Sequence, residues 1–251
     1  MLHRKAYVIE EYIKPEQLPN RLVEWKDPEL KENEILIDVH YAGLNFFDIL
    51  QIQGKYQLKP PFPWISGAEF SGVVAANSPI PKGCTFVPGK TRVFGAGQGS
   101  YAEKIKVDYR TLIEVPASMG LDAAAGLYVT MPTSYAALVN RARTQPGEWV
   151  LVHAAAGGGS IQKIPANLLL LKNVAAMGVH WGAYARNEPE AVPQVWKELL
   201  ALFESGKVRG PVFEKVFDGL EAVPEGLRAL GARETWGKAV VKVKGGREGK
   251  L

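Results

Sequence analysis

Cysteine is almost absent from this chain: Cys84 is the single one among 251 residues. One cysteine excludes an internal disulfide and any metal site built from several cysteines. It also fits a reducing compartment. We interpret Cys84 as a structural or incidental thiol and not as a nucleophile, because no histidine or basic cluster lies beside it in the sequence to activate it.

Long apolar runs and basic runs are also missing. The apolar runs are shorter than the roughly 20 residues that span a bilayer, and the first five residues do not form the apolar core of a signal peptide. The net charge of +4 is spread thinly over the chain, with no nucleic-acid-binding motif. We therefore expect a cytoplasmic protein that binds neither membrane nor nucleic acid. Its 47% hydrophobic and 22% charged residues are ordinary values for a globular protein.

The first third of the chain is rich in short strand patterns. Ile35, Ile37 and Val39 alternate with other residues, as in a strand with one buried face. Glycine and proline separate the patterns, and this spacing predicts a small, irregular barrel. The expected strands are Lys5–Ile9, Glu34–His40, Phe70–Ala75, Thr91–Phe94 and Tyr101–Val107.

The rest of the chain alternates strand and helix patterns, so the predicted fold class is mixed α/β. Trp149–Val152 is a strand candidate and is followed by the small-residue turn Ala154–Gly159. Val174–Trp181 is a second candidate for a buried strand. Apolar residues recur at helical spacing over Val192–Phe203, which predicts an amphipathic helix. Lys238–Val243 completes the barrel.

Two loops of the first third contain polar residues that need an explanation. Asn45 and Asp48 lie inside an otherwise apolar run, and burying them requires hydrogen-bond partners. Asn45 also fits the cap of a short helix over Phe46–Gln51. Glu69 follows Gly67-Ala68 and is either a buried carboxylate with partners or a solvated one; the sequence leaves both open.

Seven segments along the chain carry a resemblance: AGLNFFDILQIQGKY, PPFPWISGAEFSGVV, GSYAEKIKV, AAAGLYVTMPTSYAAL, PGEWVLVHAAAGG, IPANLLLLKNVAAMGVHWGAY and WGKAVVKV. In this order they resemble the zinc-independent quinone oxidoreductase family of the medium-chain dehydrogenase/reductase superfamily. The resemblance implies a GroES-like β-barrel domain over residues 1–125 and 207–251, and a truncated Rossmann-type α/β domain that binds NADPH over residues 126–206. The implied substrate is a quinone or another activated alkene (enone).

By this resemblance, Asn45 and Tyr56 line the nicotinamide and the substrate and are the catalytic candidates. The Tyr56 hydroxyl could hydrogen-bond a substrate oxygen and stabilise the charge that develops there. Thr130 would contact the nicotinamide, and Lys238 would close the site. Two alternatives stay open: Tyr56 as a packing residue at the edge of a hairpin, and Thr130 as a hydrogen-bonding residue at a helix start.

The small-residue turn supplies the remaining cofactor candidates. Ala156, Gly157 and Gly158 would face the diphosphate of NADPH. A flexible glycine-rich joint explains the same residues equally simply.

No zinc is expected. Zinc-containing relatives place a cysteine in the loop that here reads Leu44-Asn45, and a histidine where this chain has Ala68. Catalytic zinc needs three protein ligands and structural zinc needs four. The expected chemistry is therefore direct hydride transfer to a substrate that accepts it readily.

The chain resembles a family member with an internal deletion after Gly158. After Gly158 only the seven residues Gly159–Pro165 are available for a crossover, and a parallel crossover needs about a dozen. No Asp or Glu occurs between Glu148 and Glu188, although a ribose-binding acid normally lies about 20 residues past the turn. Roughly 90 residues are missing, enough for several βα units. Splicing, a faulty gene model, decay or engineering would each leave this trace.

Two functions remain at this stage. The first is an NADPH-dependent quinone or activated-alkene reductase that the deletion has impaired. The sequence does not decide whether the shortened chain is an active enzyme. The alternative is a non-catalytic barrel that acts as an interaction or regulatory module. The deletion leaves Leu168–Leu171 and Val174–Val179 without the cover of a full sheet. We therefore expect a homo-oligomer.

Overall fold

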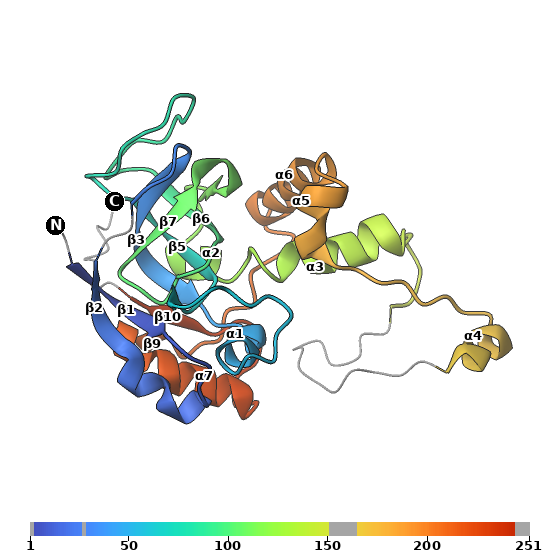
Figure 1. The fold of residues 1–251 in the computed structure, drawn as a ribbon. Coiled ribbons are helices and arrows are strands. Elements are labelled where there is room, and N and C mark those ends of the chain that lie inside the picture. The colour runs from blue at the N-terminus through green and yellow to red at the C-terminus, as the bar shows by residue number, and fades with distance from the viewer. Residues whose placement is uncertain (1–2, 27–28, 151–164, 244–251) are drawn as a thin grey trace. The chain divides into compact units, whose positions relative to one another are not determined.

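The computed structural model describes residues 3–26, 29–150 and 165–243 (Figure 1). The chain divides into two compact units, one formed by Met1–Tyr128 with Gly210–Leu251 and the other by Val129–Arg209. The diphosphate candidates Ala156, Gly157 and Gly158 lie outside the described residues. Among the residues that are described, no helix combines the length and the apolar character needed to cross a membrane.

The first unit contains a small antiparallel sheet near the N-terminus. Its central strand is β1 (His3–Ile9), which pairs with β2 (Leu22–Lys26) on one side and with β4 (Trp64–Ile65) on the other. A 3-10 helix over Pro15–Arg21 leads from β1 to β2. Expected strand Lys5–Ile9 is thus confirmed.

A larger sheet of seven strands forms the body of this unit, in the order β8-β6-β5-β3-β10-β9, with β7 also paired to β3. The other expected strands of the first third are present, each with shifted ends. The bounds are Glu34–Gly43 for β3, Glu69–Val74 for β5, Arg92–Ala96 for β6, Lys104–Asp108 for β7, Ile113–Glu114 for β8, Phe217–Asp218 for β9 and Val240–Lys242 for β10.

Strand β3 organises this sheet because it pairs with β5, β7 and β10. Its alternating residues Ile35, Ile37 and Val39 are fully buried, as their spacing predicts. Val240 lies opposite Gly43, and Leu44 N–H donates to Ala239 O at 2.9 Å. The C-terminal strand is therefore joined to the end of β3, and this brings the residues before β10 next to those after β3.

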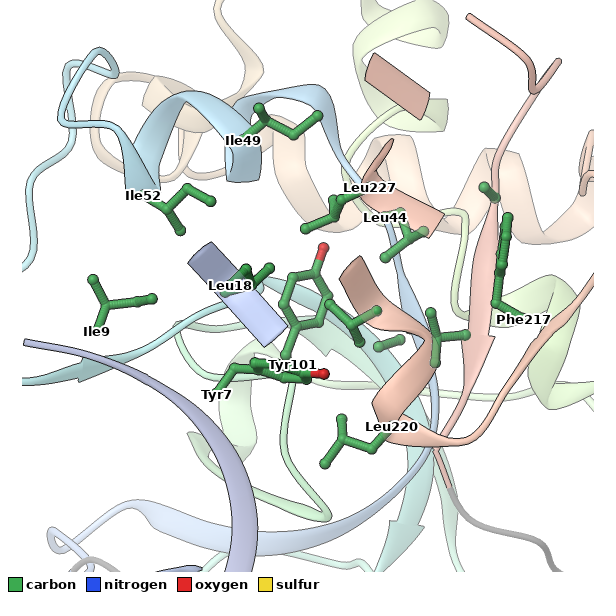
Figure 2. Close-up of a cluster of buried hydrophobic side chains, with 14 of the residues drawn as sticks. Tyr7, Ile9, Leu18, Leu44, Ile49, Ile52, Tyr101, Phe217, Leu220 and Leu227 are labelled. Atoms are coloured by element: carbon green, nitrogen blue, oxygen red, sulfur yellow. The ribbon is translucent and has the colours of Figure 1, made fainter. Parts of the chain in front are cut away.

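Helices and turns close the core of the first unit. The helices are α1 (Phe46–Ile52), α2 (Leu121–Ala124) and α7 (Val223–Gly231). Figure 2 shows the main apolar cluster, in which Tyr101 lies among side chains from β1, α1, α7 and the C-terminal strands. The labelled members are Tyr7, Ile9, Leu18, Leu44, Ile49, Ile52, Tyr101, Phe217, Leu220 and Leu227.

The second unit is helical in the residues described. Its helices are α3 (Met131–Tyr135), α4 (Ala166–Lys172), α5 (Tyr184–Asn187) and α6 (Ala191–Glu204), with a π-helical turn over Ala136–Arg141. Helix α6 buries Val195, Trp196 and Leu199, which confirms the amphipathic helix predicted here. The mixed α/β class is confirmed for the chain as a whole.

The predicted strand Val174–Trp181 is wrong. Residues 174–180 are irregular, and Trp181 begins a 3-10 turn. A buried parallel strand needs neighbours to accept and donate its backbone hydrogen bonds, and the described part of this unit contains no strand to pair with. Trp149 and Val150 are not in a strand either, and residues 151–152 of that candidate lie outside the described ranges.

Candidate functional site

Four buried polar side chains gather in the core of the first unit. Glu69 is the first residue of β5, and Lys238 comes shortly before β10. Asn45 precedes α1, and Asp48 lies within it. The exposed fractions are 0% for Glu69 and Asp48 and 5% for Asn45 and Lys238. Charged groups buried to this degree must be paired or hydrogen-bonded.

Lys238, Asn45 and Glu69 form a closed triangle of contacts. Lys238 Nζ donates to Glu69 Oε2 at 2.7 Å and to Asn45 Oδ1 at 2.6 Å. Asn45 Nδ2 in turn donates to the same Glu69 oxygen at 3.1 Å. The ammonium and the carboxylate therefore compensate each other's charge, and the amide of Asn45 bridges them.

Two glycines make room for this triangle. A Cβ atom on Gly126 would lie 2.5 Å from Lys238 Cγ. A Cβ atom on Gly43 would lie 2.4 Å from Ala125 O and 2.8 Å from Glu69 Oε2. All three distances are shorter than real Cβ contacts, so at these two positions only glycine lets the backbone come this close to Lys238 and Glu69.

The hydrogen-bonding capacity of the triangle shows what it can offer a ligand. A lysine ammonium has three N–H donors, and Asn45 and Glu69 accept two of them. Both the oxygen and the nitrogen of the Asn45 side-chain amide have partners. Oδ1 accepts from Lys238, and Nδ2 donates to Glu69 and, at 3.4 Å, to Gly43 O. The triangle can thus give one ammonium proton to a polar atom of a ligand.

A second pair of polar groups lies behind Asn45. Asp48 Oδ2 accepts from Asn45 N–H at 2.9 Å and from Tyr101 OH at 2.5 Å. Burial raises the pKa of the Asp48 carboxyl to about 7, against the opposing effect of these hydrogen bonds and of Lys238. The pKa of the Tyr101 hydroxyl is also raised, first by burial and then by the Asp48 charge, so Tyr101 stays a donor.

The polar residues singled out in the apolar run are indeed buried and have partners. Asn45 is the N-cap residue of α1, as expected, and the capping hydrogen bond comes from its own N–H to Asp48. Its side chain turns to Lys238 and Glu69 instead. The structure thus brings together the predicted residues Asn45 and Lys238, and it settles Glu69 as a buried carboxylate with partners.

Tyr56 lies apart from this hydrogen-bonded cluster. It is half-buried in the loop after α1, and its ring stacks on Phe47 with centroids 5.2 Å apart. In the described part of the chain, no hydrogen bond joins Tyr56 to Asn45 or Lys238. Tyr56 is a packing residue here, although in a loop and not at a hairpin edge. Its catalytic role stays a prediction.

Thr130 belongs to the second unit and directly precedes α3. Its carbonyl oxygen accepts from Ser134 N–H at 3.1 Å and from Ser134 Oγ at 3.2 Å. This is the hydrogen bonding of a helix start. Contact of Thr130 with a nicotinamide stays a prediction.

Sequence reasoning missed Tyr101 and left Glu69 undecided. The sequence pattern places Tyr101 only in the expected strand Tyr101–Val107, and nothing near it in the sequence marks its hydroxyl as the partner of a carboxylate. Within residues 3–26, 29–150 and 165–243, no three His, Cys, Asp or Glu side chains come together in a way that could hold a metal ion.

Comparisons with known proteins agree with this architecture. Residues 31–117 match the alcohol dehydrogenase GroES-like domain family. A quinone oxidoreductase-like protein 2 homolog from Nematostella vectensis is 27% identical over 308 residues, covering 86% of this chain and 83% of that protein. Among solved structures, the human synaptic vesicle membrane protein VAT-1 homolog-like protein has a TM-score of 0.83 at 19% identity, covering 98% of this chain and 100% of that one.

A quinone oxidoreductase from Thermus thermophilus, solved alone and with NADPH, has a TM-score of 0.75 at 23% identity and covers 95% of this chain and 100% of that one. The resemblance drawn from the sequence motifs is confirmed. The alignment to the Nematostella protein runs over 308 residues, whereas 86% of this 251-residue chain is only about 216 residues. About 90 aligned positions thus have no counterpart here, which agrees with the size of the expected deletion.

Proposed function

We propose that this chain, which resembles the quinone oxidoreductases of the medium-chain dehydrogenase/reductase superfamily, is a zinc-independent NADPH-dependent reductase of quinones or activated alkenes whose activity is impaired by an internal deletion. The first unit keeps the side of the site that faces nicotinamide and substrate. The second unit (Val129–Arg209), proposed here as what remains of the nucleotide-binding domain expected over residues 126–206, has lost the part that faces adenosine.

The buried Lys238–Asn45–Glu69 triangle carries this proposal. A buried ion pair seldom stabilises a fold better than apolar residues of the same size, so a triangle that costs desolvation is best explained by a use for its charge. Nicotinamide carries a carboxamide, and a quinone carries carbonyl oxygens, both of which accept hydrogen bonds. The third ammonium proton of Lys238 is the donor that the triangle has to offer.

NADPH supplies a hydride when it is bound. The protein itself orients the cofactor and the substrate, excludes water from them and stabilises the charge that develops on the substrate. A quinone oxygen gains negative charge as the ring is reduced, and a pre-positioned N–H donor stabilises that charge. Lys238 can be this donor because its Nζ is held in place by Glu69 Oε2 at 2.7 Å and Asn45 Oδ1 at 2.6 Å. Tyr56 would act on the substrate from its loop.

A metal is not needed for this chemistry. The residues at the site are an asparagine, a glutamate and a lysine, and the lysine ammonium binds Asn45 Oδ1 and one carboxylate oxygen of Glu69, Oε2. Zinc prefers thiolate, imidazole and carboxylate ligands, three of them at a catalytic site. The ligand chemistry therefore supports zinc-independent hydride transfer.

Titration with reduced nicotinamide mononucleotide tests the proposal, because this probe contains only the half of the cofactor for which the chain keeps a site. We expect saturable binding in the millimolar range, on the order of 4 kcal/mol. The double variant Lys238→Met with Glu69→Gln removes both charges together. It should bind the mononucleotide about tenfold more weakly, because one hydrogen bond from a charged donor is lost. The variant Lys104→Met with Asp38→Asn, which removes a partly buried ion pair whose side chains are 19% and 21% exposed, is the matched control. A chain that shows no saturable binding contradicts the proposal.

A non-catalytic interaction module is the second candidate, and exposed apolar side chains of the second unit favour it. Leu170 and Leu171 of α4 are 78% and 69% exposed, and Val174 and Met177 are exposed beyond it. Their exposure supports the expectation that the deletion leaves these segments uncovered. If the chain is such a module, the exposed apolar residues of α4 and the segment after it would pack against another copy of the chain or against a full-length subunit.

Self-association is therefore the expected behaviour in solution. We expect a dimer or larger species at a concentration of about tens of micromolar, because exposed apolar patches drive association. Replacing Leu170 and Leu171 with lysine should shift the population toward monomer, while the same change at the exposed Leu58, in the first unit, should not. Sedimentation that finds the unaltered chain monomeric would contradict this expectation.

A further inference from the structure

Asp48 is a fully buried carboxylate for which the proposed reaction has no direct use. It lies within α1, one turn after Asn45. One of its oxygens, Oδ2, accepts both hydrogen bonds, from Asn45 N–H and from Tyr101 OH. The other oxygen, Oδ1, is buried and has no hydrogen-bond partner among the described residues. Such a group is costly to keep, which points to a task.

Tyr101 is held rigidly. Its backbone N–H donates to Ser66 O at 2.9 Å, and its carbonyl accepts from Tyr7 N–H at 3.0 Å. Its ring lies in the apolar cluster of Figure 2. Gly67, with φ +85°, packs so closely that a Cβ there would come within 2.5 Å of the ring. The hydroxyl is therefore a fixed point from which Asp48 is oriented.

We propose that Asp48 and Tyr101 are positioning residues, which hold Asn45 in the orientation that lets its amide bridge Lys238 and Glu69, and that the charge on Asp48 controls this orientation. The connection is continuous: Tyr101 OH fixes Asp48, Asp48 fixes the N–H of Asn45, and the Asn45 side chain accepts from Lys238 at 2.6 Å. This inference rests on the proposed function for the ligand that it names.

The direction of the pH effect follows from the groups around Asp48. These are Tyr101, the N–H of Asn45, Lys238 and Glu69, and burial outweighs their combined effect and raises the pKa of Asp48 to about 7. Above that pH, the ionised carboxylate is a strong acceptor for both donors. Below that pH, the protonated carboxyl is a weaker acceptor, and its own O–H must also be accommodated among the buried groups. Asn45 is thus held firmly at alkaline pH and loosely at acidic pH.

The first test follows Asn45 itself by NMR and needs no ligand. In the unaltered chain, the backbone and side-chain amide resonances of Asn45 should both titrate with one midpoint, near pH 7. Asp48→Asn should abolish both titrations. Tyr101→Phe removes a bond that favours the ionised form, so it should raise the midpoint by about one unit. Asp38→Asn, which removes a carboxylate paired with Lys104 instead, should leave the midpoint unchanged.

A side-chain resonance of Asn45 that stays constant while its backbone resonance titrates would overturn the proposal, because Asp48 would then cap α1 and do nothing more. Should Asp48→Asn fail to fold, the Tyr101→Phe variant decides by itself: an unmoved midpoint overturns the proposal, and a raised one for both resonances supports it.

The second test measures the affinity for reduced nicotinamide mononucleotide against pH. Binding should be about threefold or more weaker at about pH 6 than at about pH 8, and this ratio should fall to near one in Asp48→Asn. A pH-independent affinity in the unaltered chain, with Asn45 still titrating, would overturn the link to the ligand site. Failure to bind at either pH refutes the proposed function, whereas the NMR result still decides the positioning role.

Discussion

Replacing Lys238 with methionine is expected to lower the free energy of unfolding by about 3–5 kcal/mol. The methionine is similar in length and apolar, but it leaves the Glu69 carboxylate, which is 0% exposed, without its ammonium partner. Removing one member of a buried pair is costly because the other stays desolvated. Urea denaturation followed by fluorescence of the unaltered and altered chains measures the difference.

The double variant Lys238→Met with Glu69→Gln provides the internal control. It removes both charges, so most of the lost stability should return. Lys215→Met breaks an ion pair of the same kind between side chains that are 59% and 54% exposed. It should change the unfolding free energy by less than about 1 kcal/mol. A Lys238→Met effect as small as that of Lys215→Met would show that the buried triangle is not a desolvated ion pair.

NADPH is expected to bind no better than about millimolar, several powers of ten more weakly than a complete site would allow. The chain has no Asp or Glu between Glu148 and Glu188 to bind the ribose, and the seven residues Gly159–Pro165 are too few for a crossover helix whose N-terminal amides would face the diphosphate. Each lost hydrogen bond to a charged group is worth roughly 1.5–3 kcal/mol. Calorimetric titration measures the affinity.

Three ligands make this test specific. Because the adenosine side is missing, NADPH, NADH and reduced nicotinamide mononucleotide should bind with nearly the same affinity, and quinone reduction with NADPH should barely exceed the rate without protein. In a complete site the 2′-phosphate and the adenine distinguish the three. Micromolar affinity for NADPH, or strong preference for it over NADH, would show that the shortened chain still forms a working nucleotide site.

The strands of the first unit could be predicted from the sequence because their signal is local. Ile35, Ile37 and Val39 alternate within one segment, and the alternation alone indicates which face is buried. Helix α6 was predictable for the same reason, since Val195, Trp196 and Leu199 recur at helical spacing. The strand expected over Val174–Trp181 failed because an apolar run becomes a strand only when another strand pairs with it.

For the site, the sequence by itself determined which residues needed an explanation: Asn45 and Asp48 are polar within an apolar run, and burial obliges such groups to find partners. Only the tertiary structure decided which residues are these partners. Lys238 is 169 positions from Glu69, and Tyr101 is 53 positions from Asp48. No local pattern encodes contacts at such separations; the pairing of β10 with β3 and the packing of Tyr101 against α1 create them. The physical reason is that burial and the pairing of charges are properties of the packed core, whereas periodicity is a property of one segment.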